Sequence, residues 1–331
     1  MFATCRPSPT LRSFRAMTLP LLLIGLSLGG CNGADNPLAP ADSPSATAGD
    51  PAVNDYVQAA GTTQRIVFLQ YNSSERADLF KMDPQGSSLV RVTNLSEESM
   101  HPAWSRDNQH IAMTRARTDA SNLTHVDIYV TNADGSQGHW LRPTPFPYNM
   151  DFPCWSPDGS RLLVTVDVNL TSYVGWIDVA SGQVNLFNAA AGGVKGWQGS
   201  YDKPGSHIIY TTGQTIDQIN ADGTNHKIRI SSATAVRDPK FSPDGQRIAY
   251  TKSVNNNDEI FVKNFSTGTN KRLTFTAGTD ARPTWSPDGS TLAFDSQRTG
   301  KSQVWTMTAT GGNPQRITHT TNPALWAAWS Y

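Results

Sequence analysis

Seven ionisable or aromatic residues stand just before a recurring aromatic position. Their imidazole, carboxylate, guanidinium and indole groups could take part in catalysis or in ligand binding. They are His101, Asp151, Arg237, Asp238, Asp280, Arg282 and Trp326. A histidine beside carboxylates can act as a general base, and arginine side chains can hold an acidic ligand. Each residue lies three to five positions before an aromatic residue at 104, 155, 241, 285 or 329. We therefore expect a repeated fold to bring them together at one mouth of a central channel.

The same residues also allow a structural interpretation, in which they form mutually satisfied ion pairs such as Asp238 with Arg282. A second candidate surface is the segment 143–148, where three prolines alternate with Phe146 and Tyr148. A stiff aromatic loop loses little conformational entropy on binding, so it is a candidate contact for a partner. It would serve equally well as a cover for an apolar patch on its own blade.

The aromatic positions belong to a repeat whose full form is Trp-Ser-Pro-Asp-Gly. The full form stands at Trp155–Gly159 and Trp285–Gly289, and Phe241–Gly245 has Phe in place of Trp. We align weaker or incomplete copies at Trp104, Gly199 and Trp329, which gives intervals of 42 to 51 residues. A period of this length is typical of one four-stranded propeller blade.

The last complete repeat shows how one blade is encoded. Its expected strands are 282–285, 291–294, 303–307 and 315–318, and Ser286–Gly289 is the first turn. Proline presets the first corner of such a turn, aspartate bonds to the local backbone, and glycine accepts a positive φ. We therefore interpret the aspartates of this motif as turn residues. The outermost strand carries an Arg-apolar-Thr signature, as in Arg316-Ile317-Thr318.

The two ends of the repeat array complement each other. The first repeat begins with an expected second strand at 65–71, and the chain ends with an expected first strand at 324–329. Joining the C-terminal inner strand to three N-terminal strands would remove two open sheet edges. The sequence therefore predicts an all-β fold, a closed six-bladed β-propeller over residues 63–331.

These motifs resemble the TolB-type β-propeller repeat over nearly all of the predicted domain. The resemblance implies protein–protein contact in the periplasm of a bacterium. Proteins of the TolB family also have an N-terminal α/β domain. At the corresponding place this chain has a short segment rich in Ala, Pro, Asp, Ser and Gly, so we do not expect an ordinary TolB orthologue.

The N-terminus has the features of an export signal. Three arginines precede the apolar segment 19–28, and Leu28-Gly29-Gly30-Cys31 resembles a bacterial lipobox. We expect a signal peptide at 1–30, a lipidated Cys31, and a disordered tether over 31–62. The expected location is the cell envelope, on the periplasmic side of the outer membrane, with the lipid as the only membrane contact.

The sequence favours a non-catalytic module that binds an envelope protein or peptide through this mouth. The alternative is a carbohydrate-active envelope enzyme, similar to a polysaccharide lyase, that would use His101, Arg237 and Arg282. Motifs for a serine hydrolase, a zinc protease or paired cysteines are absent from the sequence. We expect no cofactor, no metal and a monomer. The formal net charge of +0 argues against a nucleic-acid partner.

Overall fold

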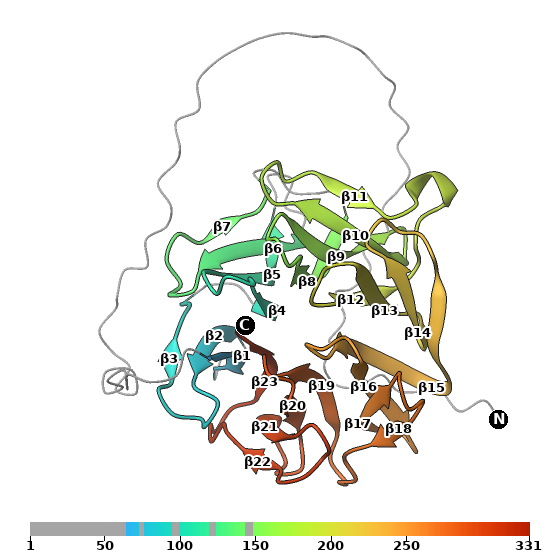
Figure 1. Ribbon diagram of the computed structural model, residues 1–331. Coiled ribbons are helices and arrows are strands. Elements are labelled where there is room, and N and C mark those ends of the chain that lie inside the picture. The colour runs from blue at the N-terminus through green and yellow to red at the C-terminus, as the bar shows by residue number, and fades with distance from the viewer. Residues whose placement is uncertain (1–63, 73–75, 95–98, 119–123, 143–147) are drawn as a thin grey trace, which may run out of the picture. The chain divides into compact units, whose positions relative to one another are not determined.

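The computed structural model describes residues 64–72, 76–94, 99–118, 124–142 and 148–331. Within these ranges the chain forms β-strands and one short 3₁₀ turn, η1 (Ala189–Ala191). The sheets are arranged radially around a common centre, as in a β-propeller (Figure 1). The predicted all-β propeller class is therefore confirmed. The predicted signal peptide, lipidated Cys31 and tether lie outside the described residues. No helix of the described part is long and apolar enough to cross a membrane.

Three sheets each hold four consecutive strands. One contains β4 (Ser99–Trp104), β5 (His110–Thr118), β6 (Thr124–Asn132) and β7 (His139–Trp140). The next contains β8 (Asn149–Trp155), β9 (Arg161–Val168), β10 (Thr171–Asp178) and β11 (Val184–Leu186). The third contains β19 (Asp280–Trp285), β20 (Thr291–Ser296), β21 (Gln303–Thr308) and β22 (Gln315–Arg316). The last of these matches the blade that the sequence predicts.

One sheet is longer because a single strand serves two strand groups. It contains β12 (Trp197–Tyr201), β13 (His207–Thr211), β14 (Gly213–Asn220), β15 (Lys227–Phe241), β16 (Arg247–Val254), β17 (Asn257–Asn264) and β18 (Asn270–Arg272). The first half of β15 pairs with β14 and its second half with β16. The sequence predicts two separate strands here. They are continuous because Val236 pairs with Gly213 of β14 on one side and with Lys252 of β16 on the other.

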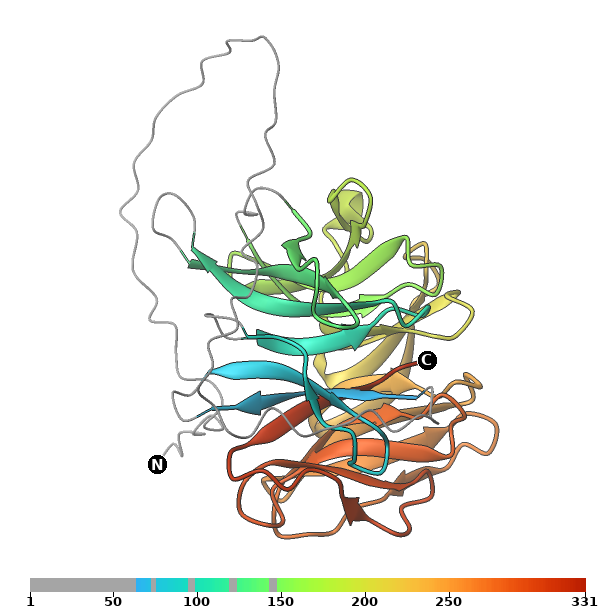
Figure 2. The ribbon, with the colours of Figure 1, turned by 90° about the vertical axis from the view of Figure 1, so that its left-hand side faces the viewer.

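The remaining sheet joins the two ends of the described chain. In this sheet β23 (Ala324–Trp329) pairs with β1 (Ile66–Tyr71), followed by β2 (Ala77–Met82) and β3 (Val90–Arg91). The antiparallel register runs from Ile66 opposite Trp329 to Gln70 opposite Ala324. The two strands, red and blue, lie side by side in both views (Figures 1 and 2).

The apolar core lies between neighbouring sheets. Leu162 and Val164 of β9, for example, pack in one buried cluster with Ile128 and Val130 of β6. Because both faces of each sheet are covered in this way, the inner strands are held rigidly around the centre.

A Ser-Pro-Asp-Gly turn follows three of the inner strands, at 156–159, 242–245 and 286–289, and its side chains hydrogen-bond to the turn backbone. The Ser286 hydroxyl donates to Asp288 Oδ1 at 2.6 Å and accepts from the backbone N–H of Thr291 at 3.0 Å. Hydrogen bonds from Ser286 and from Ser290 hold the pKa of Asp288 below its usual range. Gly289 takes a φ of 70°, which glycine adopts without steric cost. These turn contacts therefore explain why the motif has an aspartate at this position, and no catalytic role is needed to explain it.

The turn geometry also corrects the alignment of the repeat copy that we placed at Gly199. Asp202 takes the place of the turn serine, because it accepts the backbone N–H of His207 and its carbonyl accepts that of Gly205. The aromatic position of this repeat is therefore Tyr201 and not Gly199. The sequence alone misleads here because Tyr, Asp, Lys and Pro replace the first four motif residues.

Candidate functional site

A cavity of about 140 Å³ lies where the innermost strands meet. Residues of β4, β8, β12, β15, β19 and β23 line it, and these strands converge toward the centre of the molecule (Figure 1). Each lining strand is the first strand of a repeat. A cavity at this place collects one set of side chains from every repeat.

A left-handed residue sits at the same position of each lining strand. We call this set the mouth ring: His101, Phe152, Gln198, Asp238, Arg282 and Trp326, with φ between 51° and 57°. The strand pairing shifts at each of these places, as at a β-bulge. A bulge re-aims a side chain, and all six residues line the cavity. Left-handed non-glycine residues are strained, and such strain often marks functional positions.

The structure brings together four of the residues singled out from the sequence. His101, Asp238, Arg282 and Trp326 belong to the mouth ring and line one cavity. Phe152 takes the ring position next to the predicted Asp151. Gln198 was not predicted from the sequence, because its repeat was aligned on Gly199 and not on Tyr201. It stands three residues before Tyr201, as His101 stands before Trp104, and this spacing was the signal that could have revealed it.

His101 and Asp151 form a close pair enclosed by aromatic rings. His101 Nδ1 lies 2.6 Å from Asp151 Oδ1, which also accepts the Thr114 hydroxyl at 2.7 Å. Although burial opposes it, the charge of His101 and these hydrogen bonds keep the pKa of Asp151 below its usual range. The imidazole centroid lies 3.9 Å from that of Phe152 and 4.7 Å from that of Trp326. These contacts fix the orientation of the histidine.

The ion pair considered from the sequence, Asp238 with Arg282, is not the one that forms. Arg282 Nε donates to Asp295 Oδ2 at 2.5 Å, and Asp238 accepts from Gln198 Nε2 at 2.7 Å and from the Thr251 hydroxyl at 2.9 Å. Burial raises the pKa of Asp295 above its usual range, although the charge of Arg282 opposes the shift. Burial lowers the pKa of Arg282, but Asp295 and Asp238 outweigh it and raise that pKa. Asp295 was not predicted from the sequence, because the equivalent strand position of the preceding repeat holds Thr251.

The other candidates lie away from the cavity lining. Arg237 pairs with Asp258, and the fully buried Asp280 pairs with Arg298 at 3.0 Å. Both precede the bulge of their strand. Tyr148 is exposed beside the start of β8. Phe146 and Cys31 lie outside the described residues.

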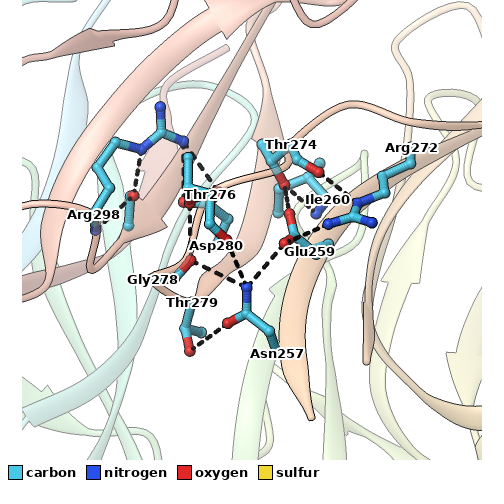
Figure 3. A network of polar contacts seen from close by, with 11 residues as sticks. Asn257, Glu259, Ile260, Arg272, Thr274, Thr276, Gly278, Thr279, Asp280 and Arg298 are labelled. Atoms are coloured by element: carbon cyan, nitrogen blue, oxygen red, sulfur yellow. Dashed lines mark hydrogen bonds and ion pairs between the residues drawn. The ribbon is translucent and has the colours of Figure 1, made fainter. Parts of the chain in front are cut away.

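Asp280 borders a polar network that belongs to the scaffold (Figure 3). In this network Arg272 Nη2 and the Thr274 hydroxyl donate to the buried carboxylate of Glu259, at 2.8 and 2.6 Å. The Ile260 N–H donates to the Thr274 hydroxyl at 2.9 Å. Arg91 and Thr93 make matching bonds to Asp78 and Leu79. The Arg-apolar-Thr signature therefore clamps the outermost strand to its neighbour.

The mouth ring has an aromatic side and a polar side, which suit binding. His101, Phe152 and Trp326 supply ring faces, whereas Gln198, Asp238 and Arg282 supply hydrogen-bonding groups. Among the described residues, no three His, Cys, Asp or Glu side chains are grouped as metal ligands would be.

Comparison with known proteins agrees with the repeat and the fold. A family model described as "TolB beta propeller domain" matches residues 216–331. The "Tol-Pal system protein TolB" of Pseudomonas putida is 34% identical over 72 residues, which cover 22% of this chain and 17% of that protein. The "Uncharacterized peptidase YuxL" of Bacillus subtilis is 25% identical over 203 residues, covering 60% of this chain and 29% of that protein. The chain thus matches less than a third of the length of these two relatives.

The crystal structure of TolB from Acinetobacter baumannii shares the fold, with a TM-score of 0.68 at 20% sequence identity. The superposition covers 80% of this chain and 66% of that chain. The radial sheets and this superposition give the described part of the chain a β-propeller fold, and residues 216–331 are similar to the TolB propeller domain.

Proposed function

We propose that this protein is a lipid-anchored cell-envelope module that binds a protein or peptide at its mouth ring, without catalysis. The observation that carries the proposal is the mouth ring itself, six left-handed residues of different chemistry that line one cavity. Side chains fixed by backbone bulges are ordered before a ligand arrives, so binding loses little entropy.

The proposal includes a closed ring of six blades. If β15 counts as two strands, the seven-stranded sheet holds two blades, and the β23–β1 sheet supplies a further one. The innermost strands contact one another in a cycle, and β23 contacts both β19 and β4. Phe68 of β1 packs in one cluster with Val304 of β21, which supports the closure of the first sheet against the last.

The envelope location rests on two further observations. The lipobox-like Leu28–Cys31 and the tether predicted over 31–62 fit a domain held near a membrane by lipid. The TolB relative carries the name of the Tol-Pal system, and we transfer from it an envelope protein as the class of partner. Tyr148, just before β8, and residues 149–151 at the start of that strand would extend the contact beyond the cavity, with Phe146 as a further candidate from the sequence.

The alternative of a carbohydrate-active enzyme is less well supported. It relied on His101, Arg237 and Arg282 acting together, but Arg237 does not line the cavity and pairs with Asp258. Arg282 is engaged with Asp295, and His101 is enclosed between Phe152 and Trp326.

Photo-crosslinking in intact cells, with a probe beside the cavity, tests the binding role. Trp326→Ala removes the largest aromatic surface of the ring, and we expect the crosslinked partner to disappear. Trp326→Phe should retain it. Ile228→Ala is the matched control, because Ile228 is exposed on the half of β15 that pairs with β14. Retention of the same partner by a folded Trp326→Ala protein would argue against the proposal.

A further inference from the structure

A second cavity, of about 270 Å³, lies on the side of the Ser-Pro-Asp-Gly turns. Its cationic lining residues are Arg106, Lys203 and Lys240, and none of the described residues that line it is Asp or Glu. Ser200, Lys240, Thr284, Trp329 and Tyr331 line both this cavity and the one below the mouth ring. The two spaces therefore meet at the level of Lys240.

Lys240 is the exception in a ring of short side chains. It stands two residues after Asp238 of the mouth ring, and the same position in the other inner strands holds Ala103, Cys154, Ser200, Thr284 and Ala328. Within the described residues Lys240 forms no salt bridge. A charged group that is partly removed from water needs a counter-charge, so an ammonium in this position favours a bound anion.

Two contacts fix the opening around this lysine. The Arg106 guanidinium lies over the Tyr331 ring, with 4.2 Å between Cζ and the ring centroid, and its Nη2 donates to the carbonyl of Lys203 at 3.0 Å. The Tyr331 main chain is bonded to Asn108 through both its N–H and its carbonyl. Although Tyr331 as a whole is 43% exposed, burial of its phenol raises the pKa to about 12. The phenol is protonated at neutral pH, as an ordinary tyrosine is, and can donate a hydrogen bond.

We propose that this cavity binds a small oxyanion, a carboxylate or phosphate group, on Lys240, with Arg106 and Lys203 at its opening. The positive side chains supply charge-assisted hydrogen bonds. The carboxylate of Asp238 in the adjoining cavity already accepts from Gln198 and Thr251, and it forms no salt bridge with Lys240 among the described residues. The site opens on the side of the turns and adjoins the cavity below the mouth ring. Binding of an anion there does not depend on the function proposed for the mouth ring.

Calorimetric titration of the full-length protein with inorganic phosphate, and separately with citrate, tests this inference at constant ionic strength. We expect saturable binding of at least one anion. Stronger binding of phosphate would identify a phosphate ligand, and stronger binding of citrate a carboxylate ligand. Lys240→Met should weaken the binding about tenfold or more, whereas Lys240→Arg should change it by about threefold or less.

Lys227→Met is the matched control, because Lys227 belongs to the same strand β15 but is exposed at its beginning. It should leave the affinity unchanged within about twofold. Protection of Lys240 from acetylation by the bound anion, followed by mass spectrometry of the unmutated protein, tests the same site without a variant. Absence of saturable binding, equal losses in the two methionine variants, or unprotected Lys240 at saturating anion would each overturn the proposal.

Discussion

At the scale of single residues, the repeat separates positions that stabilise the fold from positions that face the cavity. The turn aspartates have equivalent bonds, as Asp158 and Asp288 show through Ser156 and Ser286. The mouth-ring residues differ from one repeat to the next, and each has its own partner. Asp295, the partner of Arg282, is an unusual carboxylate because it is only 2% exposed. Its Oδ1 accepts no hydrogen bond from the described residues.

Arg282→Met should destabilise the protein by about 3–5 kcal/mol, because it leaves the buried carboxylate of Asp295 without its counter-ion. Adding Asp295→Asn should restore most of this loss, since asparagine is neutral and still offers an oxygen to the Trp326 N–H. Urea denaturation of the single and double variants measures the difference. Equal instability of both would show that Arg282 acts through packing instead of charge.

At the scale of elements, the short outermost strands depend on side-chain clamps more than on strand pairing. The strand β18 has only three residues, and Arg272 and Thr274 fix it and the following loop to Glu259 (Figure 3). The last sheet has a neutral version of the clamp, in which the Thr318 hydroxyl donates to Gln303 Oε1 at 2.8 Å. A polar cluster of this kind resembles an active site, but its recurrence with the repeat identifies it as structural.

Thr274→Val should cost about 2–3 kcal/mol of stability, because a buried carboxylate oxygen and the Ile260 N–H both lose their partner. Thr318→Val should cost less, about 1–2 kcal/mol. It also leaves a backbone donor, the Val304 N–H, without its partner, but the acceptor that it abandons is the uncharged amide of Gln303. Chemical denaturation of the two variants in parallel gives the comparison. A larger loss at Thr318 would contradict the importance of the charged acceptor.

At the scale of the whole domain, stability depends on the pairing of β23 with β1. This pairing covers the backbone of β1, and the buried Ile66 and Phe68 of β1 share a cluster with Trp329. Without β23, the sheet would present an open edge and an uncovered apolar face, a combination that promotes aggregation.

Removal of residues 319–331 should therefore abolish cooperative unfolding and give soluble aggregates in size-exclusion chromatography. Removal of Tyr331 alone should leave a folded monomer, because this residue lies beyond β23. Thermal melting monitored by circular dichroism tests both truncations. A sharp transition in the longer truncation would show that the other sheets form a stable domain without β23.

Much of the architecture follows from the sequence. The Trp-Ser-Pro-Asp-Gly spacing predicts the turns, and the alternating apolar residues predict strands such as β19 to β22, because turns and strands obey local rules. The strand at 324–329 also stands out without its partner. Local rules fail at Tyr201, where the motif residues have changed, and at β15, where a turn is missing between two expected strands.

The channel chemistry was decided by the tertiary structure. Side-chain alternation does not reveal a backbone bulge, so the sequence could not separate Phe152, which lines the cavity, from Asp151 beside it. Nor could it assign Asp295 to Arg282, or show that two cavities meet at Lys240. Only the packing of the inner strands around one centre sets the distances and the burial that give each of these groups its partner.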